Sequence, residues 1–140
     1  MNKIILFACL IIAAPILQTG CQHEVALESG GIYSDPVLAT TDRAILDASH
    51  AMADFVQWHA ANATFLAKWP EVGALAAKVG AGRDGWVRTA YAARDAYAQA
   101  SAAYKAGKQG PPDGSQLRAA LAVLTNATTQ ITSYRSSHAN

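Results

Sequence analysis

A single histidine interrupts an apolar face in the first half of the chain. Side chains on that face recur every seven residues, at Ile45, Met52, His59 and Leu66, which is typical of one side of a helix. A histidine buried there must satisfy two ring nitrogens, and Thr128 or a tyrosine hydroxyl is a candidate partner. Asn62 lies one turn later, at the edge of the same face. The sequence predicts a polar core layer of His59, Asn62 and Thr128 that sets the register of the helices. The alternative is an internal site that binds a ligand or handles protons.

A second group of polar residues has a spacing that metal ligands use. His50 and Asp54 lie one helical turn apart, and Asp47 lies one turn earlier. They share the face opposite the apolar one, without a third and fourth ligand from elsewhere, so we expect no metal. Haem is excluded, because no Cys-x-x-Cys-His motif occurs, and Met52 and His59 could not reach opposite faces of a porphyrin from one helix. We expect no cofactor.

The motifs of nucleophilic and phosphate chemistry are missing. No serine lies in a Gly-x-Ser-x-Gly turn, and the glycines at 80 and 82 lack both a preceding strand and a following Lys-Ser or Lys-Thr. The acidic residues are spread over predicted exposed faces. The sequence therefore favours a protein that is not an enzyme.

Cys21 stands at the end of an apolar leader. Lys3 precedes the uncharged run Ile4–Leu17, which is shorter than the about 20 residues of a membrane span but fits a signal peptide. Residues 17–21, Leu-Gln-Thr-Gly-Cys, resemble the lipobox of bacterial lipoproteins, although Gln18 occupies the position that is usually leucine. The resemblance implies that residues 1–20 are removed and that Cys21 carries diacylglycerol. Because Gln22 is not aspartate, the resemblance also implies the outer membrane, with the domain facing the periplasm. The alternative is an ordinary secretory leader and a soluble periplasmic protein.

The charge of the chain is balanced. There are 11 Lys and Arg and 10 Asp and Glu. Removing residues 1–20 takes away Lys3 and no acid, so the two signs become equal. Without a basic patch, nucleic acid is not an expected partner.

The elements that would position these residues are helices. Residues 21–34 show no period and predict a flexible tether. Asp35 before Pro36 predicts a helix start, with Thr41 as a rival, and Trp69-Pro70 predicts its end near Lys68. We expect a short helix over 70–79, which a break at Gly80-Ala81-Gly82 separates from a helix over 83–106. The last helix is expected to start at Asp113 or Ser115 and to fray after residue 135. The fold class is all-α: a small three-helix, up-down-up bundle over 35–137 with one additional short helix.

The expected task is binding. Among the aromatic residues, Trp58 and Tyr91 are the candidates for an exposed docking patch. We expect a membrane-tethered interaction module with a protein partner in the bacterial envelope. By analogy of architecture alone, it would serve envelope assembly or the exclusion of phages by a prophage. The alternative is a helical periplasmic protein that binds a small ligand or metal through His59, or through His50 and Asp54.

Overall fold

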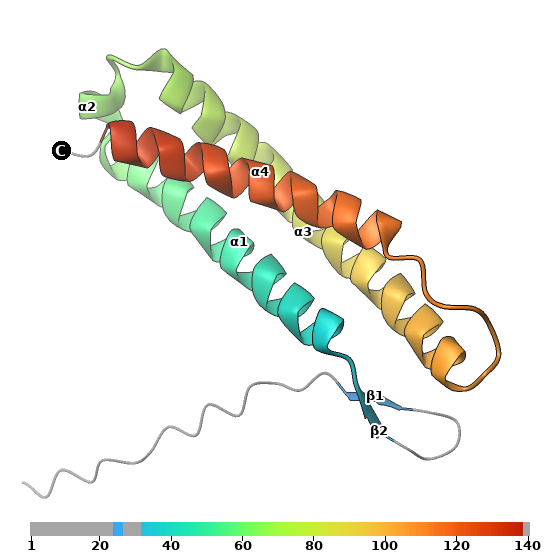
Figure 1. The fold of residues 1–140 in the computed structure, drawn as a ribbon. Helices are drawn as coiled ribbons and strands as arrows, with labels where there is room; N and C mark the ends of the chain where they lie inside the picture. Colours follow the sequence, from blue (N-terminus) through green and yellow to red (C-terminus); the bar gives the residue numbers. More distant parts are fainter. Residues whose placement is uncertain (1–23, 27–31, 139–140) are drawn as a thin grey trace, which may run out of the picture.

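The computed structural model describes residues 24–26 and 32–138. In these residues, three long helices pack against one another in an up-down-up order (Figure 1): α1 Pro36–Ala61, α3 Pro70–Lys105 and α4 Ser115–Ser137. A short helix, α2 Ala63–Leu66, lies between α1 and α3. The predicted all-α bundle is therefore confirmed. The predicted leader and Cys21 lie outside the described residues.

The start of α1 is fixed by a buried carboxylate. One oxygen of Asp35 accepts a hydrogen bond from the backbone N–H of Val37 at 2.9 Å, and Pro36 follows in the first turn. The other oxygen accepts a hydrogen bond from the hydroxyl of Ser101 near the end of α3, at 2.7 Å. Asp35 is therefore the N-cap, as expected, and Thr41 lies inside the helix. The cap also joins the first turn of α1 to the last turns of α3.

The first helix ends earlier than the sequence predicts. It stops at Ala61 rather than near Lys68, and the backbone N–H of Asn62 closes it on the carbonyl oxygens of Trp58 and His59. The side-chain amide of Asn62 also donates to the Trp58 carbonyl at 2.8 Å. α2 then turns the chain toward Pro70. The additional short helix therefore exists, but at 63–66 rather than at 70–79.

The third helix runs without a break through the glycines at 80, 82 and 85, where the sequence predicts an interruption. Two of these glycines lie against bulky side chains. A Cβ at Gly80 would lie 3.9 Å from Val56 of α1, and a Cβ at Gly82 would collide with the indole of Trp86. The contact at Gly80 is with α1, whereas the contact at Gly82 is within α3 itself. α3 stays helical although each helical glycine costs about 1 kcal/mol.

The connection from α3 to α4 follows the sequence closely. Gly107 has φ 70°. Its N–H bonds to the Tyr104 carbonyl, and the N–H of Lys108 bonds to the Ala103 carbonyl, which together close the helix. At the start of α4, Asp113 accepts hydrogen bonds from the backbone N–H and the hydroxyl of Ser115. α4 continues to Ser137, two residues beyond the predicted fraying point.

A β-hairpin precedes the bundle. Strands β1 Glu24–Ala26 and β2 Ile32–Ser34 pair antiparallel, with Glu24 opposite Ser34. β1 also contacts α3. The sequence predicts no regular structure in this segment, so the hairpin is a finding of the structure. The bundle itself is slim, and no described helix has a stretch that is both long and apolar enough to cross a bilayer.

The core runs along the axis of the bundle and draws on all three long helices. Its large buried side chains are those of Ile45, Met52, Phe55, Leu66, Val72, Leu75, Val79, Leu124 and Ile131. Small residues close the gaps between them, Ala90 being fully buried. A core this thin leaves part of the apolar surface of each helix near solvent.

Candidate functional site

The structure does not assemble the predicted polar layer. His59, Asn62 and Thr128 are all half-buried, and no hydrogen bond within the described residues joins any two of them. The Thr128 hydroxyl donates to the carbonyl oxygens of Leu124 and Thr125 on its own helix, at 3.1 and 3.0 Å. The imidazole of His59 lies beside α3, where a Cβ at Gly73 would be 3.5 Å from Nε2.

The depth predicted for His59 was wrong for a geometric reason. His59 lies in the last turn of α1, which ends at Ala61, so the helix does not continue beyond the imidazole. The seven-residue spacing itself holds for the buried side chains of Leu38, Ile45 and Met52. The buried face of α1 steps through Leu38, Thr41, Ile45, Ala48, Met52 and Phe55, and α1 ends soon afterwards.

His50 and Asp54 are exposed on α1. Within the described part of the chain, no group of three or more His, Cys, Asp or Glu side chains could hold a metal ion. His59 lines none of the four main cavities found among the same residues. The geometry thus lends no support to the ligand-binding alternative.

Trp58 and Tyr91 do not form one patch. Trp58 stacks on Phe55 with 5.7 Å between ring centroids, and the guanidinium of Arg135 lies 5.7 Å above the indole. Tyr91 is 39% exposed and lies one turn from Arg94, which contacts Asp42. Because Asp42 and Trp58 are 16 residues apart on α1, the two aromatics are separated by roughly 20 Å along the bundle.

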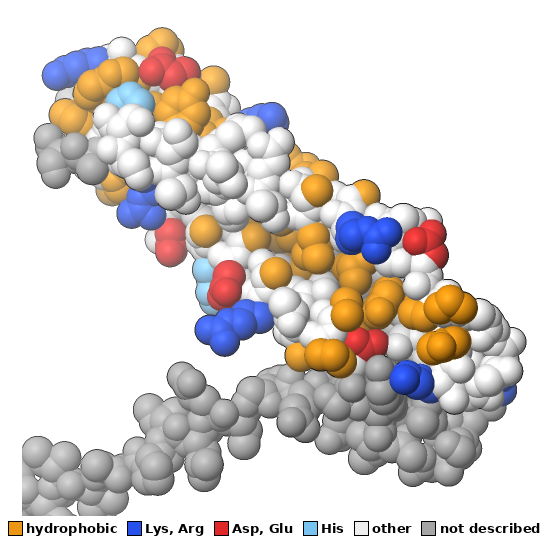
Figure 2. Space-filling model, in the orientation of Figure 1, with side chains coloured by type: hydrophobic (Ala, Val, Ile, Leu, Met, Phe, Trp, Pro, Cys, Tyr) orange, Lys and Arg blue, Asp and Glu red, His pale blue; other side chains and the backbone are white. Residues whose placement is uncertain are grey.

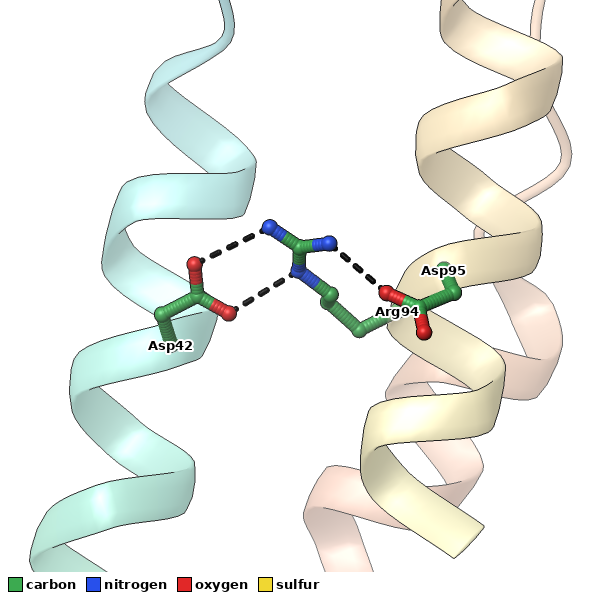
Figure 3. A network of polar contacts seen from close by, with 3 residues as sticks. All are labelled: Asp42, Arg94 and Asp95. Carbon is green, nitrogen blue, oxygen red and sulfur yellow. Dashed lines mark hydrogen bonds and ion pairs between the residues drawn. The ribbon is translucent and has the colours of Figure 1, made fainter. Parts of the chain in front are cut away.

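One ion-pair network joins α1 to α3 (Figure 3). The Arg94 side chain is 12% exposed, and its Nε and Nη2 donate to the two oxygens of Asp42 at 2.9 and 3.1 Å. Its remaining nitrogen donates to Asp95 at 2.7 Å. Burial first, and the Asp95 carboxylate second, raise the pKa of Asp42, although the two hydrogen bonds from Arg94 favour the ionised form. The network joins the two helices.

Aromatic rings gather at the end of the bundle that holds α2. Trp69 lies 5.1 Å from Phe65 and 4.7 Å from the ring of His138, which also stacks on Tyr134 at 6.0 Å. The ammonium of Lys68 lies 5.5 Å from the Phe65 ring. These contacts attach the last turn of α4 to the α1–α3 connection, which explains why α4 does not fray where the sequence predicts.

Two apolar grooves flank α4. The α1–α4 groove, of about 440 Å³, is lined by Pro36, Val37, Thr40, Thr41, Ala44 and Leu121. The α3–α4 groove, of about 520 Å³, is lined by Thr89, Ala92, Ala93, Gln116, Ala119, Ala120 and Val123. Figure 2 shows hydrophobic side chains gathered on the face that holds α1 and α4, toward the hairpin end.

The rims of these grooves carry large apolar side chains, since Val37 is 45% exposed and Val123 is 46% exposed. The sequence did not indicate either groove, because many of the residues that line them are alanines and threonines, which also suit a closed core. The feature of the sequence that could have indicated the α3–α4 groove is Val123, an apolar residue that falls outside the regular buried face of α4.

Comparison with known proteins adds no assignment to this geometry. No family model, no curated protein and no solved structure matches the chain.

Proposed function

We propose that this chain is a lipid-anchored binding module of the bacterial envelope and has no enzymatic activity of its own. The observation that carries the proposal is Cys21, which directly follows Gly20 after a short apolar run with a basic start. A diacylglycerol on Cys21 together with a further acyl chain would hold the bundle stably on a membrane. Gln22 favours the outer membrane, with the bundle in the periplasm.

The α3–α4 groove is the surface that best suits a protein partner. Its alanine lining lets another backbone approach closely, and Val123 supplies an exposed apolar edge. A groove between two helices fits an amphipathic helix from a partner, with apolar side chains spaced by one helical turn. Envelope assembly and prophage-borne exclusion are two tasks that such a module could serve.

The anchor is tested by the intact mass of the protein extracted from membranes. We expect loss of residues 1–20 and addition of acyl chains at Cys21. In the variant Cys21→Ala the protein should leave the membrane fraction or keep its leader. A soluble wild-type protein without added mass would contradict the proposal.

The binding surface is tested with two matched variants of α4. Ala119 lines the groove and Ala122 does not, and both side chains are exposed. A photo-crosslinking residue at position 123 should give one adduct of defined mass in intact cells. Ala119→Glu should abolish this adduct because it places a charge in the groove, whereas Ala122→Glu should leave it. Equal yields of the adduct in both variants would show that the partner does not bind in this groove.

A further inference from the structure

The α3–α4 groove continues beyond Val123. A second cavity of about 110 Å³ follows it toward the α2 end of the bundle, and Val123 lines both cavities. We call this cavity the Trp86 pocket; it is lined by Leu75, Lys78, Val79, Trp86, Val123, Asn126, Ala127 and Gln130. On α4 the two cavities extend from Gln116 to Gln130, which is about 21 Å or about four helical turns. Together they form one long groove, whose length matches that of a short helix.

The Trp86 pocket has an apolar lining that suits an anchoring side chain. Val79 is fully buried, and Leu75 and Ala127 are nearly so. The half-buried Trp86 also lines the pocket, and tryptophan is among the residues that most often dominate the binding energy of an interface. A cavity of about 150 Å³ holds a benzene ring. The smaller Trp86 pocket therefore suits one aliphatic side chain of a partner.

Three polar side chains line the same pocket. Lys78 and Asn126 are exposed, and Gln130 is half-buried. The Gln130 amide donates to the side-chain oxygen of Asn126 at 2.9 Å, and the Asn126 amide nitrogen has no acceptor among the described residues. Lys78 is the one ionisable side chain among the described residues that line the long groove. The groove is therefore uncharged over most of its length and cationic at the α2 end.

No neighbouring acid balances the charge of Lys78. Within the described part of the chain, no ion pair joins its ammonium to a carboxylate. On α3, Asp84 is paired with Arg83 at 2.9 Å, and Glu71 lies two turns before Lys78, roughly 10 Å away along the axis. α4 lines the other side of the pocket and has no acidic residue. This end of the groove is therefore complementary to an anionic group.

A helix that fills the long groove must match both of its parts. Apolar side chains spaced by three and four residues suit the alanine-lined stretch and the Trp86 pocket. Without an anion, the bound helix would remove water from the Lys78 ammonium and supply no partner in return. A carboxylate one turn beyond the side chain in the pocket would pair with Lys78 and accept a hydrogen bond from the Asn126 amide. Charge complementarity of this kind selects one partner over others.

We propose that the long groove binds an amphipathic helix of another protein, with an aspartate or glutamate at the end of its apolar face. The last apolar side chain of this helix enters the Trp86 pocket, and the carboxylate pairs with Lys78. The inference rests on the proposed function, in which the α3–α4 groove is the binding surface. It adds the class of the partner helix and the end of the groove that its acidic residue occupies.

The experiment uses the full chain in its host cells, with the photo-crosslinking residue at position 123, which lines both cavities. Three variants are compared at low expression, where the yield of the adduct follows affinity. Lys78→Glu reverses the charge in the groove, and Lys78→Arg keeps it. Arg118→Glu makes the same reversal at an exposed position that lines neither cavity. Because Lys78 is exposed as well, all three variants should fold, which circular dichroism of the purified proteins checks.

A second measurement tests the contact directly in the chain with its natural Val123. Isolated envelopes are treated with a carbodiimide, which couples an amine to a carboxylate in contact with it by loss of water. Mass spectrometry of the digested protein then identifies the peptide that is linked to Lys78. We expect an aspartate or glutamate of the same partner that forms the adduct at position 123.

We expect Lys78→Glu to lower the yield of the adduct about tenfold, whereas Lys78→Arg and Arg118→Glu should keep the yield of the parent chain. Three results would overturn the acidic helix while the groove stands as a binding surface: equal yields in Lys78→Glu and Arg118→Glu, equal losses in Lys78→Glu and Lys78→Arg, or no link from Lys78 to the partner. An adduct with twice the mass of the chain would replace the partner with a second copy. No adduct in the parent chain would overturn the binding surface, and this inference with it.

Discussion

Two glycines three residues apart in α3 meet different surroundings. A Cβ added at Gly82 would collide with the Trp86 indole, whereas a Cβ at Gly85 would meet nothing within 4 Å. We expect Gly85→Ala to raise the free energy of unfolding by about 0.5–1 kcal/mol, since alanine suits a helix interior better than glycine. Gly82→Ala should lower it by about 1–3 kcal/mol, because Trp86 must leave its position. Urea denaturation followed by tryptophan emission measures both; equal stabilisation by both changes would contradict the Trp86 contact.

Asp113 gives the start of α4 a dependence on pH. The hydroxyl of Ser115 first, and its backbone N–H second, lower the pKa of Asp113. Because the folded pKa lies below the unfolded value, this carboxylate stabilises the fold above pH of about 3.8, and its contribution is lost as the pH falls through the folded pKa. NMR titration should therefore find the Asp113 pKa below 3.8. In Ser115→Ala the pKa should rise, since the largest cause is removed; an unchanged pKa would exclude the hydroxyl as that cause.

At the scale of the elements, α4 offers adjacent residues with opposite burial. Leu124 is 2% exposed in the core, and Val123 is 46% exposed at the rim of the α3–α4 groove. Leu124→Ala should lower the free energy of unfolding by about 2–5 kcal/mol because it leaves a cavity. Val123→Ala should change it by less than about 0.5 kcal/mol, as at an ordinary surface site. Thermal unfolding of the two variants checks this; similar losses would mean that α4 is rotated relative to the structure.

At the scale of the whole molecule, a buried hydrogen bond ties the start of the bundle to the far end of its longest helix. Ser101 donates to Asp35, and both are 3% exposed. In Ser101→Ala the carboxylate oxygen stays buried without this donor, which should cost about 1–3 kcal/mol. Ser136→Ala, on the exposed surface of α4, should stay within about 0.5 kcal/mol of the wild type. For each of these proteins, circular dichroism and tryptophan emission should report the same midpoint of unfolding, as expected for a single cooperative unit.

Local backbone chemistry accounts for much of what the sequence predicts. The all-α class, the starts at Asp35-Pro36 and Pro70, and the stop at Gly107 all follow from local backbone chemistry. A proline restricts φ, a carboxylate before it caps free N–H groups, and a glycine adopts positive φ. These effects act within a few residues, so the sequence alone determined where most of the helices begin and end.

Tertiary contacts decided the rest. A helical glycine can mark either a break or a space for a neighbour. In the structure Gly80 lies beside Val56 of α1, and α3 continues through it without a break. The depth of His59 depends on where α1 ends, which a seven-residue pattern does not record. The two grooves and the hairpin likewise depend on which surfaces meet. An alanine suits a closed core and an open groove equally well, because its side chain is too small to distinguish them.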